Sequence, residues 1–523
     1  RRYLPETNVL ETNYRTAGGA ARVTDALTLP LSGLPPRREL VRRVDGLAGS
    51  VAFAWEVEPR FDYARSGTRI ERRGSIPIAT SGADALAVAS WDAGEAQCHG
   101  EQIHGQFEIE PGRSALIVIA HGHQEPVVVP ARAEVERRLE ETVRFWQQWA
   151  RGRSYTGPWR EEVLRSALVL KLLVFSPSGA IAGAGTTSLP ETMAGNNNYD
   201  YRYSWIRDSA FTMNALLELG CAPEAKAFFS WLMHASQLTH PELRVLYRLD
   251  GREEVTEHEL PLEGYRSSRP VRIGNRAAAQ LQLDAYGDLL DSARLYADHG
   301  LDREIGKRLT AIADFVCEIW TEKDAGIWEL RDETRPFTEG KMKCAIALEA
   351  ACSLVEPGLA PAEHRARWQA EAAKIRHFVE SRCWAPEVNS YVRAADGGDL
   401  DASVLFAGQN RYSERGDPRL AATIDVIRRE LGSGPFLYRH TGQRGKEGAF
   451  VACSFWLVSA LARVGRIDEA GQLMDELLAQ ANDVGLFSEE IDPATGESLG
   501  NFPQGLSHLA VVNAAAALAE AQR

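Results

Sequence analysis

The sequence predicts two domains of different fold class, an antiparallel β-sandwich over residues 1–129 and a helical domain over residues 158–523. In the first part, short runs carry apolar side chains at every second position and are separated by Gly and Pro, which is typical of half-buried antiparallel strands. After Pro130 the apolar spacing changes to three or four residues, the period of an amphipathic helix. The length of 523 residues also exceeds what one ordinary core supports, so two or more domains are expected.

Two stretches carry the strand prediction most clearly. Residues 51–57 place large apolar groups on alternate positions, so one face of this strand is expected to be buried. Residues 115–120 and 127–129 are apolar runs on either side of a segment with Gly and Pro, and they predict a hairpin. His121 and His123 are expected in its solvated turn, and we find no catalytic cluster in this domain.

Residues 130–157 predict a helical linker between the two domains. Val135, Leu139, Val143 and Trp146 recur at steps of three or four residues, with Glu and Arg between them. Gly and Pro just beyond this run end the helix.

The remaining chain predicts eleven or twelve helices joined by long irregular segments, which suggests paired helices that close into a ring. Inner helices of such a ring should be apolar on more than one side, as residues 449–464 and 506–518 are, and outer helices should carry a charged face, as residues 361–383 do. No internal repeat is sharp enough to prove six pairs. The joints that carry unusual sequence are residues 183–206, 255–275, 324–338, 434–447 and 485–505.

Charge and cysteine usage limit the partners. Lys and Arg number 59 against 72 Asp and Glu, a net charge of −13, which argues against a nucleic acid or an acidic membrane as partner. The seven cysteines are scattered and show no metal-ligand or disulfide spacing, so we expect no metal, no cofactor and a reducing cytoplasm. No apolar run approaches the roughly 20 residues of a membrane span. The chain starts at Arg1 without Met, so we expect the natural N-terminus to lie upstream.

Two distant glutamates are candidate catalytic groups. Glu329 follows Trp328 in the stretch 326–331, and Glu489 follows Phe487 and Ser488, so each carboxyl group lies beside bulky apolar residues. If both face one pocket, one could donate a proton to a glycosidic oxygen while the other activates water. The competing interpretation of each stretch is a wall residue beside a solvated carboxylate.

The densest polar stretch is residues 196–208, which combines Asn, Tyr and Trp with an Arg207–Asp208 pair just before a helix. Such a pair can cap the helix, because carboxylates favour helix N-termini. In a pocket it would instead offer donors and an acceptor to sugar hydroxyls, with Trp205 as a stacking surface. The residues alone leave both interpretations open.

Six groups of residues together resemble glycoside hydrolase family 15, in the order and spacing of its bacterial branch. They are residues 186–191, 198–208, 326–329, 447–450, 488–490 and 500–509. That branch includes glucoamylase-like enzymes, glucodextranases, isomaltose-active enzymes and actinobacterial trehalases. The resemblance covers nearly the whole chain, and it implies a β-sandwich followed by an (α/α)6 barrel with an active-site pocket at one end.

The resemblance also implies residue roles in an inverting reaction. Glu329 would be the general acid, Glu489 the general base, and Glu490 is the alternative base. Inversion requires the two carboxyl groups to lie ~6.5–9.5 Å apart, with room for a water molecule. Trp328 beside Glu329 would raise the pKa of the acid by desolvation. The substrate-binding residues implied are Tyr201, which would hold the water with Glu489, and Trp205, Arg207, Asp208, Trp328 and, as a looser match, Arg439.

The sequence departs from the family at one notable place. After the acid stretch, family members often carry Ser-Lys-x-x-x-Trp, whereas this chain has Gly340 and Lys341 followed by Ala345. An alanine in place of an indole is expected to widen the pocket or change which leaving sugar is held. Gly183 and Gly505 also stand where slightly larger residues are common.

The favoured function is an exo-acting inverting α-glucoside hydrolase that releases β-glucose from the non-reducing end, as a glucoamylase does. The alternative is a trehalase that hydrolyses α,α-trehalose. A phosphorylase would need phosphate in place of the base, which Glu489 argues against, and retention of both glutamates argues against a non-catalytic carbohydrate-binding protein. The expected partner is a small oligosaccharide or disaccharide, and a homo-oligomer is left open.

Overall fold

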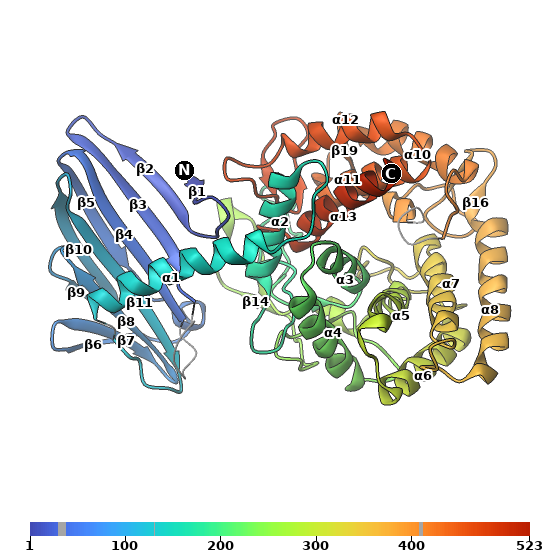
Figure 1. Ribbon diagram of the computed structural model, residues 1–523, viewed down its shortest axis with the longest axis horizontal. Helices are drawn as coiled ribbons and strands as arrows, with labels where there is room; N and C mark the ends of the chain where they lie inside the picture. The colour runs from blue at the N-terminus through green and yellow to red at the C-terminus, as the bar shows by residue number, and fades with distance from the viewer. Residues whose placement is uncertain (30–37, 130, 407–411) are drawn as a thin grey trace. The chain divides into compact units, whose positions relative to one another are not determined.

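The computed structural model describes residues 1–29, 38–129, 131–406 and 412–523. The chain divides into two compact units, Arg1–Gly152 and Arg153–Arg523 (Figure 1). No helix within these described ranges is long and apolar enough to cross a membrane.

The first unit is built from two antiparallel sheets, as the sequence predicts. Eight strands pair in the order β1-β2-β3-β4-β11-β8-β7-β6, and three more in the order β5-β10-β9. Alternate side chains of both sheets form one apolar core, in which Trp55 Nε1 donates to the carbonyl of Ala93 at 2.7 Å. The strands are β1 Arg2–Tyr3, β2 Leu10–Arg15, β3 Gly19–Leu27, β4 Arg38–Gly49, β5 Val51–Val57, β6 Arg69–Arg73, β7 Ile76–Ser81, β8 Asp84–Trp91, β9 Gln97–His99, β10 Gln102–Ile109 and β11 Ser114–His123.

The prediction of a hairpin over residues 115–129 is wrong. Residues 115–120 lie in β11, but residues 124–129 form no strand. The physical reason is that β11 pairs with β4 along one edge and with β8 along the other, so it has no edge left for the segment that follows. His121 and His123 therefore lie at the end of a strand, where each ring contacts Asp84 Oδ1, at 3.0 and 2.9 Å.

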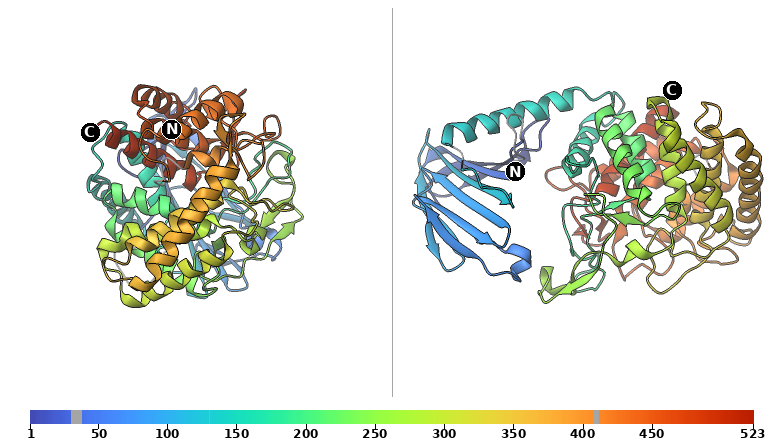
Figure 2. Two further views of the ribbon diagram at one scale, coloured as in Figure 1. Left: turned by 90° about the vertical axis from the view of Figure 1, so that its right-hand side faces the viewer. Right: turned by 90° about the horizontal axis from the view of Figure 1, so that it is seen from below.

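Helix α1 (Arg132–Arg151) lies in the segment expected to link the domains, and it packs on the first unit. Figure 2 shows it, in cyan, beside the strands of this unit. It is held by a buried ion pair in which Arg138 Nε and Nη2 donate to Glu39 at 3.1 and 2.6 Å, and Thr28 donates to the same carboxylate at 2.7 Å. Both charged side chains are only 4% exposed.

The second unit is the predicted (α/α)6 barrel. Its inner ring runs α3, α5, α7, the short helix η7 (Ala402–Leu405), α11 and α13, and it closes by contact of α13 with α3. Helices α2, α4, α6, α8, α10 and α12 lie outside (Figure 1). The bounds are α2 Arg160–Leu173, α3 Ser209–Glu218, α4 Ala222–Gln237, α5 Asp284–Tyr296, α6 Arg303–Ile319, α7 Thr338–Ser353, α8 Arg365–Phe378, α10 Pro418–Leu431, α11 Val451–Arg463, α12 Ile467–Leu478 and α13 Gly505–Ala521.

Burial separates inner from outer helices as predicted for α11 and α13, whose residues are buried on nearly every side. The joints fold into small antiparallel pieces, of which β20-β21-β22 is the largest. These pieces are β12 Ser204–Trp205 with β13 Leu246–Tyr247, β14 His258–Leu260 with β15 Val271–Ile273, β16 Trp384–Ala385 with β17 Ser390–Tyr391, β18 Gly432–Ser433 with β19 Phe436–Leu437, and β20 Ala449–Phe450 with β21 Glu490–Ile491 and β22 Ser498–Leu499.

The Arg138–Glu39 pair gives a prediction about stability. Arg138→Leu leaves Glu39 buried without its cation, and breaking a buried pair in this way is expected to cost about 3–5 kcal/mol. Urea unfolding of the full chain, with hydrogen exchange read in α1 and β4, measures this loss. Arg137→Leu is the matched control, because Arg137 is 49% exposed and pairs with Glu141 in solvent. Equal effects of the two substitutions would contradict the prediction.

Candidate active site

The joints at one end of the barrel enclose a pocket with an empty volume of about 550 Å³, including its open mouth. Four of its lining residues come from the joint before α3, and four from the joint between α6 and α7. Asn275 and Ala277, at the short helix η3 (Arg276–Ala279), and four residues of the C-terminal third complete the lining. A larger hollow of about 1510 Å³ is lined by other parts of the barrel and contains none of the predicted site residues.

The structure brings all eight predicted residues to this end of the barrel. Five of them line the pocket: Tyr201, Arg207, Trp328, Glu329 and Arg439. The other three, Trp205, Asp208 and Glu489, form the layer directly behind, where each contacts a lining residue.

Glu329 lies in a loop between α6 and α7 and has a left-handed backbone, with φ of 56°. Such a conformation costs a non-glycine residue of order 1–3 kcal/mol, so other contacts must hold it. Gln280 provides them, since its side-chain amide donates to the carbonyls of Glu329 at 3.1 Å and Leu330 at 3.0 Å. The carboxyl Oε1 then accepts from Trp205 Nε1 at 2.6 Å and from Arg207 Nη1 at 3.1 Å.

Different neighbours of Glu329 shift the pKa of its carboxyl group in opposite directions. Burial raises the pKa of the carboxyl group, and Arg207 and the Trp205 indole lower it, with a net rise. Arg207 also donates to the Ile327 carbonyl at 2.6 Å and to Asp208 at 3.1 Å. Asp208 directly precedes α3 but makes no side-chain cap on it, so the helix-cap interpretation of this pair is wrong.

Glu489 is fully buried just before β21. Its Oε2 accepts from the backbone N–H of Asn501 at 3.1 Å, and Oε1 has no aligned donor among the described residues. The hydroxyl of Tyr201 is nevertheless close enough to lower the pKa of Glu489, as Asn501 and Arg439 also do, although burial raises the pKa overall. Gly500, with φ of 72°, is required here because a Cβ would lie 2.5 Å from Oε2.

Tyr201 connects the two glutamates. Its ring stacks on Trp205 with centroids 5.1 Å apart, and Trp205 in turn donates to Glu329. Burial, followed by the charges of Glu489, Glu191 and Glu329, raises the pKa of the Tyr201 hydroxyl well above its usual value. Burial and these charges favour the protonated phenol, which can donate a hydrogen bond.

Glu490, the alternative base, faces a different group of side chains. Adjacent strand residues point to opposite faces, and Glu490 Oε2 accepts from Gly448 N–H at 2.9 Å. Its other oxygen lies 3.7 Å from Arg439, which pairs with Glu447 at 2.7 and 2.5 Å and with Glu191 at 2.9 Å. Arg439 also lies over the Trp328 ring at 5.5 Å, so this group braces one pocket wall.

The three glutamates around Arg439 have carboxylate oxygens within 4.8 Å of one another, a spacing that could hold a cation. The guanidinium of Arg439 is bonded within the group and supplies positive charge there. Burial raises the pKa of Glu191 and of Glu490, so these two carboxyl groups retain protons more readily than an exposed glutamate.

Sequence reasoning missed several pocket residues. Glu191, Tyr199 and Arg331 all lie inside stretches that the sequence singled out, but no role was assigned to them. Their place in those stretches was the only sign in the sequence of a role in the pocket, because the residues that they contact are far away in the chain. Ala345, where a pocket indole was expected to be lost, is buried in α7 and is not among the described residues that line the pocket.

Gly183 supports the site from behind, since a Cβ there would lie 2.9 Å from the Trp205 ring. A residue larger than glycine would displace the indole that donates to Glu329.

Known proteins resemble this chain over most of its length. Residues 157–516 match the family described as Glycosyl hydrolases family 15. A trehalase of Mycolicibacterium smegmatis is 36% identical, over 98% of this chain and 81% of the relative, and a trehalase of Thermoplasma acidophilum is 32% identical, over 99% and 90%. A bacterial glucoamylase solved in complex with acarbose has the same fold, with a TM-score of 0.74, 14% identity, and coverage of 99% of this chain and 85% of that one.

These matches, with the barrel and its pocket, define an enzyme that hydrolyses glycosidic bonds. The chain belongs to glycosyl hydrolases family 15.

The raised pKa of Glu191 predicts a pH dependence of stability. A carboxyl group whose pKa is higher in the folded protein stabilises it fully below the unfolded pKa of about 4.5, and this contribution is lost as the pH rises through the folded pKa. Glu191→Gln keeps the side chain neutral at every pH. As the pH rises from about 5 to about 8, the free energy of unfolding of this variant should therefore fall less than that of the wild type. Urea unfolding at several pH values measures the difference. Glu363 is exposed, so the Glu363→Gln control should show the same pH dependence as the wild type. If the free energy of unfolding depends on pH in the same way in the wild type and both variants, the raised pKa assigned to Glu191 is refuted.

Proposed function

We propose that this protein is a trehalase, which hydrolyses α,α-trehalose with Glu329 as general acid and Glu489 as general base. The observation that carries the proposal is that a partly buried glutamate, Glu329, and a fully buried one, Glu489, are brought together at the pocket residue Tyr201. Glu329 accepts from the Trp205 indole that stacks on the Tyr201 ring, and Glu489 lies beside the Tyr201 hydroxyl. The choice of trehalose is supported by the trehalases that match nearly the whole chain at 36% and 32% identity. The motifs alone place a glucoamylase-like activity first, and these relatives favour trehalase instead.

In the proposed reaction, one glucose lies with its anomeric carbon between the two carboxyl groups. Glu329 gives its proton to the bridging oxygen, so the bond between that oxygen and the anomeric carbon breaks and the second glucose leaves with its hydroxyl restored. A water molecule attacks the anomeric carbon from the opposite side and loses a proton to Glu489. The free Oε1 of Glu489 and the Tyr201 hydroxyl are the two groups suited to hold that water.

Arg207 is proposed to link substrate binding to the protonation of Glu329. With no sugar in the pocket, its Nη1 donates to Glu329 and favours the ionised carboxylate. Sugar hydroxyls that compete for the donors of Arg207 weaken this contact. The pKa of Glu329 then rises further, and the acid carries its proton when a glycosidic oxygen is present to receive it.

Two substitutions test the roles. Glu329→Gln removes the proton donor and Glu489→Gln removes the base, so each should lower kcat by roughly 10²–10⁴-fold or more without unfolding the protein. Glu490→Gln is the matched control, because Glu490 faces the Arg439 group and should retain most activity. Glucose release from trehalose measures the rates, and near-normal turnover by Glu489→Gln would remove the base assignment.

A substrate panel tests the function itself. Trehalose, maltose and isomaltose are compared by glucose release, with and without inorganic phosphate. The proposal expects trehalose to have the highest kcat/KM and phosphate not to appear in the product. Preference for maltose would establish a glucoamylase-like enzyme, and formation of glucose 1-phosphate would establish a phosphorylase.

A further inference from the structure

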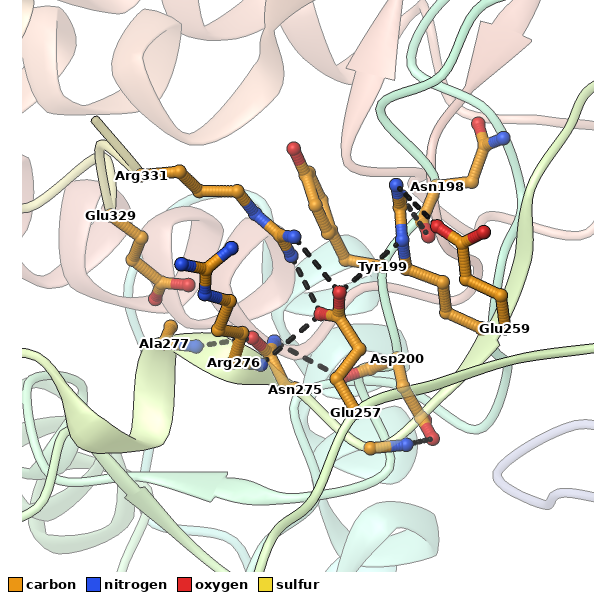
Figure 3. A network of polar contacts seen from close by, with 12 residues as sticks. Asn198, Tyr199, Asp200, Glu257, Glu259, Asn275, Arg276, Ala277, Glu329 and Arg331 are labelled. Atoms are coloured by element: carbon orange, nitrogen blue, oxygen red, sulfur yellow. Dashed lines mark hydrogen bonds and ion pairs between the residues drawn. The ribbon is translucent and has the colours of Figure 1, made fainter.

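One wall of the pocket is formed by residues that the proposed reaction does not use. Tyr199, Asn275, Ala277 and Arg331 line it. Figure 3 shows these four side by side with Glu329. We call them the Arg331 wall.

The position of this wall follows from the chemistry of the acid. The proton of Glu329 goes to the oxygen that joins the two sugars, so the departing sugar must lie next to Glu329 and away from Glu489. Arg331 is two residues beyond Glu329 in the same loop and lines the same pocket. Figure 3 shows its side chain beside Glu329, which is the side where the second sugar of a disaccharide would be.

Arg331 is held in one orientation by Glu257. Its Nη1 and Nη2 donate to the two carboxylate oxygens at 2.9 and 2.6 Å, and Glu257 also accepts from the backbone N–H of Arg276 at 3.1 Å. A paired guanidinium of this kind is fixed in plane as well as in position. These two bonds use two of the five N–H donors of an arginine, and the side chain is 25% exposed at the pocket.

Tyr199 packs against the same guanidinium. Arg331 lies 4.7 Å from the centre of its ring and Arg272 lies 5.4 Å from it, both within cation–π range. Arg272 also faces Glu257 at 3.4 Å, so the carboxylate, both arginines and the ring form one network. Glu257 precedes strand β14 and Arg272 lies in β15, so the hairpin of the 255–275 joint supports the wall from outside.

We propose that Arg331 determines specificity by binding the departing glucose through its remaining N–H donors. This inference rests on the proposed function, because it needs a substrate whose leaving group is a sugar. A fixed arginine beside an aromatic ring can donate hydrogen bonds to the hydroxyls of a neutral sugar. A leaving group without hydroxyls cannot accept these bonds. An alternative role is that Arg331 only positions the loop of Glu329.

Binding measurements separate the two roles without relying on turnover. In the inactive Glu489→Gln protein, Arg331→Met should raise the Kd for trehalose by about tenfold or more, the loss expected for hydrogen bonds from a charged donor. The Kd for methyl α-glucoside, which has one sugar and a methyl group, should stay within about twofold. Isothermal titration calorimetry of the full chain gives both values.

Two further variants keep the test decisive if Arg331→Met does not fold. Arg331→Lys and Glu257→Gln should weaken trehalose binding in the same selective way, because each removes the paired geometry. Arg276→Met is the control, since this neighbouring arginine is exposed and is not among the described residues that line the pocket. Unchanged trehalose binding in the Arg331 variants, or equal loss for both ligands, would overturn the proposal.

The failure of this inference can be told apart from failure of the proposed function. If the wild type prefers maltose, the proposed function fails, and the same comparison is made with maltose against methyl α-glucoside. Selective loss of disaccharide binding would then still assign the departing sugar to Arg331.

Discussion

The constraint on which this site depends is the burial of carboxyl groups with few cations to neutralise them. Glu191, Glu447 and Glu490 gather around Arg439, Glu329 shares Arg207 with Asp208, and Glu489 relies on hydrogen-bond donors. Burial is the first cause of the raised pKa at Glu191, Glu329, Glu489 and Glu490. A pocket in which protons are retained so readily is suited to an acid that must hold its proton near neutral pH.

The barrel makes this burial tolerable because its rigid inner helices carry irregular joints at one end. The left-handed backbone of Glu329 is fixed by Gln280, and the close approach of Gly500 to Glu489 is possible only because glycine lacks a Cβ. Contacts between distant joints then set the pocket walls. Arg439 reaches Glu191 across 248 residues of sequence, and Arg331 reaches Glu257 across 74.

Much of this arrangement could be predicted from the sequence, and the exceptions have physical reasons. Alternation of apolar residues predicted the sandwich, and a change of period predicted the helices. The prediction of a hairpin after β11 is wrong, because the apolar pattern of a strand does not show that both of its edges are already paired. Helix α7 contains charged residues that would be expected at the surface, yet Glu339, Lys341 and Lys343 are all buried, and Lys343 pairs with Asp288 at 2.7 Å inside the barrel. The motif residues come together in the structure, whereas the Arg331 wall depends on a partner that local sequence does not reveal.

The stereochemistry of the products tests the central claim most directly, because the claim is that two carboxyl groups act from opposite sides of one sugar with a water between them. Proton NMR of the glucose released from trehalose in the first minutes, before the anomers equilibrate, measures it. Attack by water with inversion predicts one β-glucose from the cleaved unit for each α-glucose that departs. Release of α-glucose alone would mean a retained configuration and would contradict the roles given to Glu329 and Glu489.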